Sequence, residues 1–285
     1  MRLKKFSLVA VLAFTLAASI SADEIKPKRS LQGNMNEVYN TLPSTANNLG
    51  EAFTNGMFYG RLRTNIFRYD WEAPDNASNA DNKAFGLGGS LIYKTAPLSG
   101  LSATAGLYYS SSPFDSLRED DANIGFVKSG KDTFSRYDVS TDGDWYMAVL
   151  AQAYLQYDIS KTSFKFGRHF FESALTASND TKMIPNSFEG VSFESRDLAK
   201  TTLKGAYLTA QKLRDHTSFH DVLTFKDSSG NSWNNNDDSG VHKGLSYTNF
   251  RAAGEDPEHE LVIAAVNNKS IENLQFDVTY TAVPD

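Results

Sequence analysis

Residues 145–157 place an apolar side chain at every second position. The odd positions are Trp145, Met147, Val149, Ala151, Ala153, Leu155 and Tyr157. Successive side chains of a β-strand point to opposite faces, so the segment predicts a strand with one apolar face and one mixed, mostly polar face. Twelve residue steps of about 3.3 Å, tilted by about 40°, separate the terminal aromatic residues by roughly 30 Å along a membrane normal. A strand of this length and pattern is typical of one that crosses lipid.

The same alternation recurs in three further segments, at residues 85–94, 101–110 and 274–280. A strand of a soluble β-sandwich also alternates, so a single segment would not distinguish the two folds. Four segments of one design favour a transmembrane antiparallel β-barrel of the outer-membrane type. A soluble periplasmic β-sandwich remains the alternative all-β fold.

The alternation and the turn-rich segments between the apolar runs predict nine strands and a short helix near residues 48–53. We expect the strands near residues 56–69, 83–94, 101–110, 144–158, 162–169, 187–195, 201–213, 259–267 and 272–281. Their connectors alternate between longer and shorter, and the longest spans residues 214–258. Outer-membrane barrels alternate long extracellular loops with short periplasmic turns in this way.

Nine strands are an awkward number for a closed barrel. Bacterial single-chain barrels have an even number of strands, and an unpaired strand edge in hydrocarbon leaves backbone groups without hydrogen-bond partners. We therefore expect residues 56–285 to form about nine N-terminal strands of a longer barrel, preceded by a periplasmic lead-in at residues 23–55.

The N-terminus, residues 1–22, has the pattern of a secretory signal peptide. Arg2, Lys4 and Lys5 precede a mostly apolar run, and Ala22 provides a small residue at the expected cleavage point. Its removal would take three of the 28 basic residues and none of the 34 acidic ones, which changes the formal charge from −6 to −9. This acidic balance argues against nucleic acid as a partner. Cysteine is absent, so neither disulfides nor thiolate metal sites contribute.

Two arginines are the first candidates for function. Arg61 and Arg63 share one face of their strand with Tyr59 and Asn65, whereas the other face is apolar. We expect the arginines to point into the lumen, because on the lipid face each would cost about 2–4 kcal/mol at mid-depth. They are interpreted either as a basic track for the carboxylate of a solute or as ion-pair partners that brace the wall.

The strand at 162–169 offers two more basic residues. Lys165 lies at a position whose side chain is expected to point into the lumen. Arg168 shares parity with Phe164 and Phe166, so a regular strand would direct it to lipid. A bulge at Gly167 would turn it inward, and a position beyond the membrane would leave it hydrated.

The connector at 170–186 carries charges of both signs, at Glu172, Asp180 and Lys182. Folded into the lumen, it could present both charges to a solute that carries an amine and a carboxylate. Alternatively, these residues tie the loop to the wall, and the two roles are compatible.

Metal and enzyme chemistry have little support. His216 and His220 have the spacing of two ligands on one helical face, but they lie in a loop without an obvious third ligand. A serine hydrolase would need an oriented Ser–His pair, and no Gly-x-Ser-x-Gly elbow occurs. We expect no metal, no cofactor and no enzymatic activity.

Several motifs resemble the OprD-like family of Gram-negative outer-membrane porins. Residues 49–70 resemble the family's first strand. Phe166-Gly-Arg-His169, then Asp180-Thr-Lys-Met-Ile-Pro185, then Leu203-Lys-Gly-Ala-Tyr207 follow the family's pattern of a Gly-Arg strand end, an Asp-x-Arg-Met/Leu-x-Pro loop and the next strand. Lys182 departs from the pattern, since it keeps the charge of arginine but loses the planar, two-pronged donation.

The resemblance implies a barrel narrowed by inward-folded loops, located in the outer membrane. It implies passive uptake of small solutes, often carboxylates or amino acids, along a ladder of arginines that Arg63 matches and that Arg168 would join. It places Glu172, Asp180, Lys182 and Pro185 in the constriction loop. The partners are then outer-membrane lipid and small solutes, and a homo-oligomer remains open. The alternative is a non-conducting surface protein that binds a partner through long loops such as 214–258.

Overall fold

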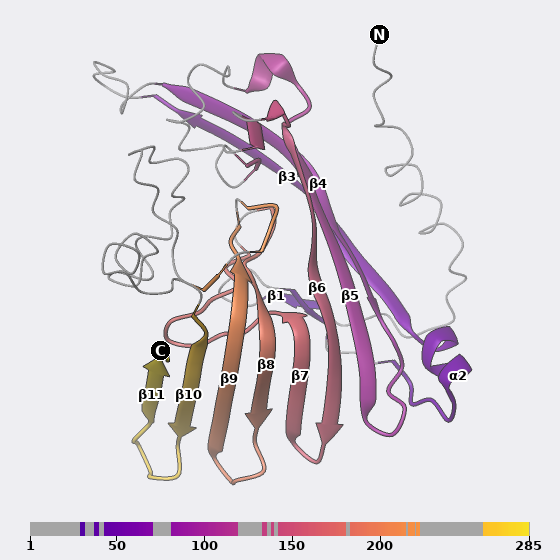
Figure 1. Cartoon of the computed structure of the whole chain (residues 1–285), viewed down its shortest axis with the longest axis vertical. Helices are drawn as coiled ribbons and strands as arrows, with labels where there is room; N and C mark the ends of the chain where they lie inside the picture. Colours follow the sequence, from indigo (N-terminus) through magenta and orange to yellow (C-terminus); the bar gives the residue numbers. More distant parts are fainter. Residues whose placement is uncertain are drawn as a thin grey trace.

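A single curved β-sheet forms most of the structure (Figure 1). This computed structural model describes residues 29–31, 37–39, 43–70, 81–118, 133–135, 138–139, 142–180, 183–214, 216–219, 221–222 and 259–284. The predicted signal peptide, Lys182, His220 and most of the 214–258 loop lie outside these residues. The predicted division into signal peptide, lead-in and barrel therefore stays a prediction.

The sheet contains nine antiparallel strands, and each pairs with its neighbours in the sequence, in the order β11-β10-β9-β8-β7-β6-β5-β4-β3. The strands are β3 (Met57–Tyr69), β4 (Asn82–Lys94), β5 (Leu101–Ser111), β6 (Tyr146–Ile159), β7 (Thr162–His169), β8 (Ser187–Ser195), β9 (Thr201–Lys212), β10 (Leu261–Asn268) and β11 (Phe276–Ala282). All nine expected strands are present. The largest difference is at β11, which begins at Phe276 instead of near residue 272.

Smaller elements surround the sheet. Helix α2 (Leu49–Thr54) confirms the short helix expected near residues 48–53, and η1 (Asp115–Leu117) follows β5. Strands β1 (Arg29–Leu31) and β2 (Glu37–Tyr39) form a separate two-stranded sheet that the sequence did not predict. Within the described part of the chain, no helix is long and apolar enough to cross a membrane.

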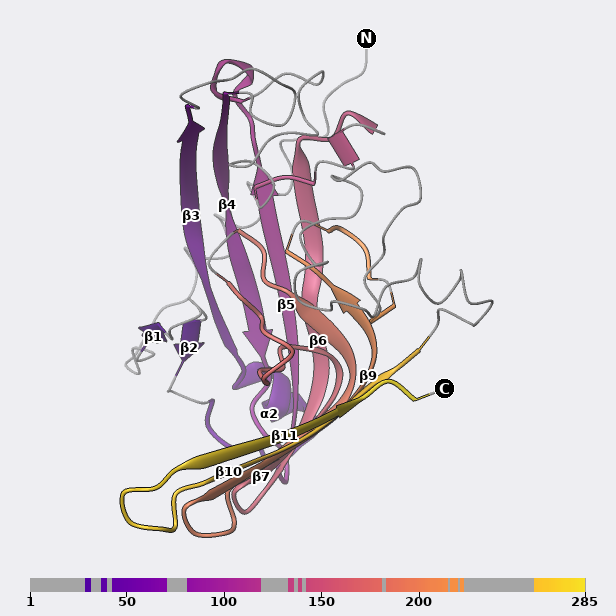
Figure 2. The ribbon, with the colours of Figure 1, turned by 90° about the vertical axis from the view of Figure 1, so that its left-hand side faces the viewer.

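The nine-stranded sheet is open. Figures 1 and 2 show it bending between β3 and β11, and in the described residues these two outermost strands each pair on one side only. The structure thus confirms an all-β, antiparallel, incomplete barrel of about nine strands.

The two faces of the sheet differ in exposure. The outer face carries large apolar side chains that are open to solvent, with Leu62 85%, Ile66 75% and Phe166 63% exposed. The inner face carries Arg61 and Arg63 and is covered by the loop at residues 170–186. An apolar outer face opposite a polar and loop-covered inner face is the arrangement that a strand in lipid requires.

The prediction for residues 145–157 was wrong in one respect: their odd positions do not share one face. In the pairing of β5 with β6, Gly106 lies opposite Gln152 but Leu107 lies opposite Leu150, so Ala151 is an extra, bulged residue. Met147, Val149 and Ala151 consequently face inward and are buried. The outer positions of the other half are Ala153, Leu155 and Tyr157, of which the last two are 50% and 43% exposed. The apolar run therefore combines an inward-facing set of residues in its first half with an outward-facing set in its second half.

Candidate functional site

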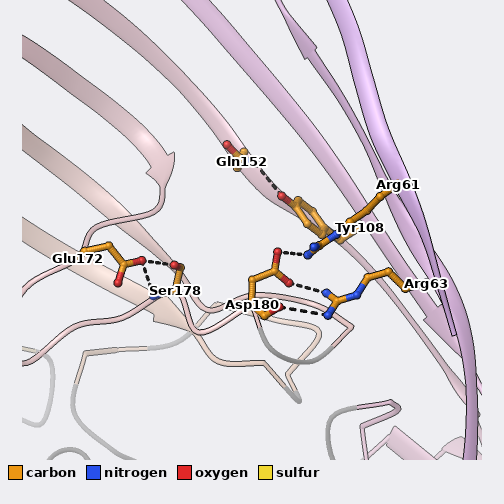
Figure 3. Close-up of polar contacts among 7 residues, drawn as sticks. All are labelled: Arg61, Arg63, Tyr108, Gln152, Glu172, Ser178 and Asp180. Atoms are coloured by element: carbon orange, nitrogen blue, oxygen red, sulfur yellow. Dashed lines mark hydrogen bonds and ion pairs between the residues drawn. The ribbon is translucent and has the colours of Figure 1, made fainter. Parts of the chain in front are cut away.

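The loop at residues 170–186 crosses the inner face of the sheet. It leaves the end of β7, packs over residues of β6, β5 and β4, and reaches β3 at Asp180. Figure 3 shows Asp180 between the side chains of Arg61 and Arg63. There, the Asp180 carboxylate accepts a hydrogen bond from Nη2 of Arg61 through Oδ2 and one from Nη1 of Arg63 through Oδ1, the latter at 2.6 Å. Nη2 of Arg63 also donates to the Asp180 backbone oxygen at 3.1 Å. The loop is thus attached to a strand that lies four places away in the sheet.

These three side chains are nearly removed from solvent. The relative exposures of the side chains are 8% for Arg61, 11% for Arg63 and 4% for Asp180. Charge-assisted bonds from planar guanidinium groups to a carboxylate are strong, and burial reduces screening by solvent. The cluster thus brings two guanidinium groups to one carboxylate.

Apolar contacts with the inner face of the sheet also hold this loop. Met183 and Ile184 are fully buried against the inner face, where they form one cluster with Ile92, Tyr108, Met147, Val149 and Ala151. Tyr59 and Phe170 pack at the edge of this cluster. Pro185 is buried next to it. This packing explains why the inward positions of β6 are apolar in its first half.

Polar contacts also brace the loop internally. Glu172 accepts hydrogen bonds from the backbone N–H of Ser178, at 3.0 Å, and from its hydroxyl group (Figure 3). Lys204 of β9 donates to the backbone oxygen of Glu172 at 3.3 Å. On the wall beneath, Nε2 of Gln152 donates to the Tyr108 hydroxyl group at 2.8 Å. Of the charged loop residues, Glu172 therefore shapes the loop, whereas Asp180 attaches it to β3.

Arg168 has a different environment from Arg61 and Arg63. It lies opposite Glu189 on β8 and pairs with that carboxylate, and its guanidinium lies 4.3 Å from the ring centre of Phe219. The pairing on both sides of β7 continues through Gly167 without a register shift, so the bulge that was one of two alternatives for Arg168 is absent. Gly167 instead has a φ of 113° and faces Gly190, whose φ is 145°, a backbone geometry that favours glycine.

Lys165 belongs to a small polar group on the inner face. Its ammonium group lies 5.3 Å from the centre of the Tyr154 ring. Tyr154 contacts the ring of His169, and His169 is buried and hydrogen-bonded to the Ser192 hydroxyl group at 2.7 Å. The sequence suggested no role for His169. Its even spacing from Lys165, four residues along the same strand, is the feature that places it on the inner face.

Comparisons with solved structures identify the same fold. OccK9 (OpdG) from Pseudomonas aeruginosa matches with a TM-score of 0.57 and 17% identity, over 82% of this chain and 52% of that one. OccAB4 from Acinetobacter baumannii gives 0.54 and 16%, over 81% and 51%. A BenF-like porin from Pseudomonas fluorescens Pf-5 gives 0.52 and 14%, over 81% and 50%. The chain spans about half the length of these structures.

The family comparison agrees with the fold. The model of the family described as outer membrane porin, OprD family, matches residues 127–252, which include the loop that crosses the inner face. No curated protein matches the chain. The matched family is described as outer-membrane porins, and the fold is the one seen in the solved porin structures. The resemblance found in the sequence motifs is therefore confirmed by a match to the OprD family model over residues 127–252 and by a fold shared with solved porins.

Proposed function

We propose that this chain supplies part of the wall and the constriction loop of a passive diffusion porin that prefers small solutes carrying a carboxylate. The observation that carries the proposal is the attachment of Asp180, in the loop, to Arg61 and Arg63 on β3. This attachment holds the loop over the inner face, where it narrows any lumen that the sheet encloses.

The charges at this attachment favour anionic solutes. Two guanidinium groups meet at the Asp180 carboxylate on the inner face. Planar guanidinium donors match the geometry of a carboxylate, and a cationic patch in a narrow lumen raises the local concentration of anions. Conduction also requires that binding be weak enough for release, and competition from Asp180 weakens the binding of a solute carboxylate.

The proposed path includes Tyr59, Arg61 and Arg63 on β3 and Lys165 on β7. Arg168 joins this path only where a solute draws its guanidinium away from Glu189. Glu172, Asp180, Lys182 and Pro185 form or shape the proposed constriction. An amine on the solute would interact with the carboxylates of this loop, which extends the proposal to amino acids.

Two measurements test the proposal in the whole protein. Reconstitution in planar bilayers should give discrete conductance steps, and their absence from an inserted preparation contradicts a pore. Replacement of Arg61 and Arg63 by Ala should lower the ratio of anionic to neutral uptake into liposomes, measured with two solutes of equal size. Added salt should reduce the difference by screening.

Leu62→Ala is the matched control for these variants. It changes the residue between the two arginines, on the outer face of the same strand. We expect it to leave the ratio of anionic to neutral uptake unchanged. If the arginine variants change the uptake of both solutes by the same factor, Arg61 and Arg63 brace the wall and do not select the solute.

A further inference from the structure

Helix α2 exposes two large apolar side chains at the end of the sheet that carries the short connectors. Leu49 is 67% exposed and Phe53 is 57% exposed. Residues four positions apart lie on the same face of a helix, so these two side chains form one apolar surface. The helix has only six residues, and Ala52 is the buried one among them.

The contacts of Tyr93 place this helix on the outer side of the sheet. Tyr93 follows Leu91 in the row of side chains on the outer face of β4. Its ring packs against Phe58, an outer-face residue of β3, with 4.5 Å between the ring centres. Its hydroxyl group donates to the backbone oxygen of Phe53 at 2.5 Å. The end of α2 therefore continues the outer face beyond the first residues of β3.

Backbone hydrogen bonds and packing fix the position of the helix. Ala52 is buried, and its backbone oxygen accepts a hydrogen bond from Ala96 N–H at 2.8 Å. The chain just before the helix is held by a bond from Ala46 N–H to Pro97 O at 2.9 Å. At the N-terminus, the Asn48 side chain accepts from the backbone N–H of Glu51 at 2.9 Å. The exposed apolar surface is thus presented by an anchored helix.

We propose that α2 is an interfacial anchor, whose Leu49 and Phe53 insert into the boundary between headgroups and acyl chains of the periplasmic leaflet. The argument is continuity: the helix extends a surface that faces lipid, at the end of the sheet where the barrel meets the interface. Apolar side chains on a helix that lies along this boundary are buried by lipid, and an aromatic residue is favoured there. The proposal rests on membrane insertion of the sheet and not on the proposed solute preference.

The absence of cysteine allows a direct test by site-directed spin labelling. Three variants of the whole protein, each with one cysteine, are labelled with a nitroxide in phospholipid vesicles: F53C on the helix, L62C on the outer face of β3, and K161C in the exposed turn between β6 and β7. Power saturation then compares collisions with oxygen, which partitions into lipid, and with a water-soluble nickel chelate. We expect a several-fold higher ratio of oxygen to nickel accessibility at residues 53 and 62 than at 161.

Each alternative outcome has a defined meaning. A label at residue 53 that behaves like the label at 161 overturns the anchor, because the helix is then in water. A label at 53 that neither reagent reaches also overturns it, because a protein then covers the surface. A water-exposed label at 62 would contradict insertion of the sheet itself, which separates that failure from a failure of the anchor alone.

Discussion

Asp180 is the residue on which the position of the constriction loop depends. It joins two arginines that precede it by 119 and 117 residues in the sequence. The loop motif and the basic strand could each be recognised in the sequence, but their contact could not. It depends on the route of a loop across three intervening strands, which no local pattern encodes. The sequence left open whether these residues form a solute track or a brace, and the geometry shows that they are at least paired.

Asp180→Asn should release the loop from β3. The change keeps the size of the side chain but removes the carboxylate that pairs with both buried guanidinium groups. The loss of one member of a buried ion pair costs about 3–5 kcal/mol. We expect a larger single-channel conductance and a shift of the reversal potential toward anion selectivity, together with lower stability in urea.

Asp70→Asn is the matched control for that change. Asp70 pairs with Arg68, an arginine of the same strand, but both side chains are exposed. Exposed ion pairs contribute little, so conductance and stability should match those of the parent. Unchanged conductance in both variants would show that Asp180 does not hold the loop.

Strand β6 shows how far alternation predicts an element and where it fails. The alternation placed the strands of the sheet correctly because the outer face of each must be apolar. It could not locate the bulge at Ala151, because Met147 and Val149 are apolar for another reason, namely burial under the loop. Apolar side chains buried under the loop and apolar side chains that face lipid have the same pattern in a sequence. The alternation therefore could not show where the strand changes from one to the other.

Leu150 and Gln152 provide the test of this bulge. A regular strand would direct both side chains to the same face, whereas the bulge directs Leu150 outward and Gln152 inward. Leu150→Arg should therefore lower the free energy of unfolding in lipid by about 2–4 kcal/mol, the cost of a charge near mid-depth on the lipid face. Gln152→Arg, on the inner face, should cost less. Equal effects in urea titrations would contradict the bulge.

At the scale of the whole molecule, the sheet has two open edges. In the described residues, β3 and β11 are paired on one side only, and β11 is exposed on both faces. Each backbone group without a partner costs several kcal/mol in hydrocarbon. Nine strands closed on themselves would also leave little space, since eight already give an interior filled by side chains.

We therefore expect the 285 residues alone to form no stable closed barrel. The measurement is gel migration with and without heating, after refolding in detergent. A closed barrel resists SDS and runs as a compact, faster band until it is heated. Such a band from this chain would show that the nine strands close after all.

The link between Asp180 and β3 has a consequence for the shape of the sheet. The loop starts at β7 and contacts β3, so it connects two strands directly across the curved inner face. The distance that the loop can span therefore limits how far these two strands can move apart. Contacts within this chain therefore constrain the bend of β3 to β7, independently of any pairing of first and last strands. A sheet that is already curved loses less conformational entropy when its first and last strands come together.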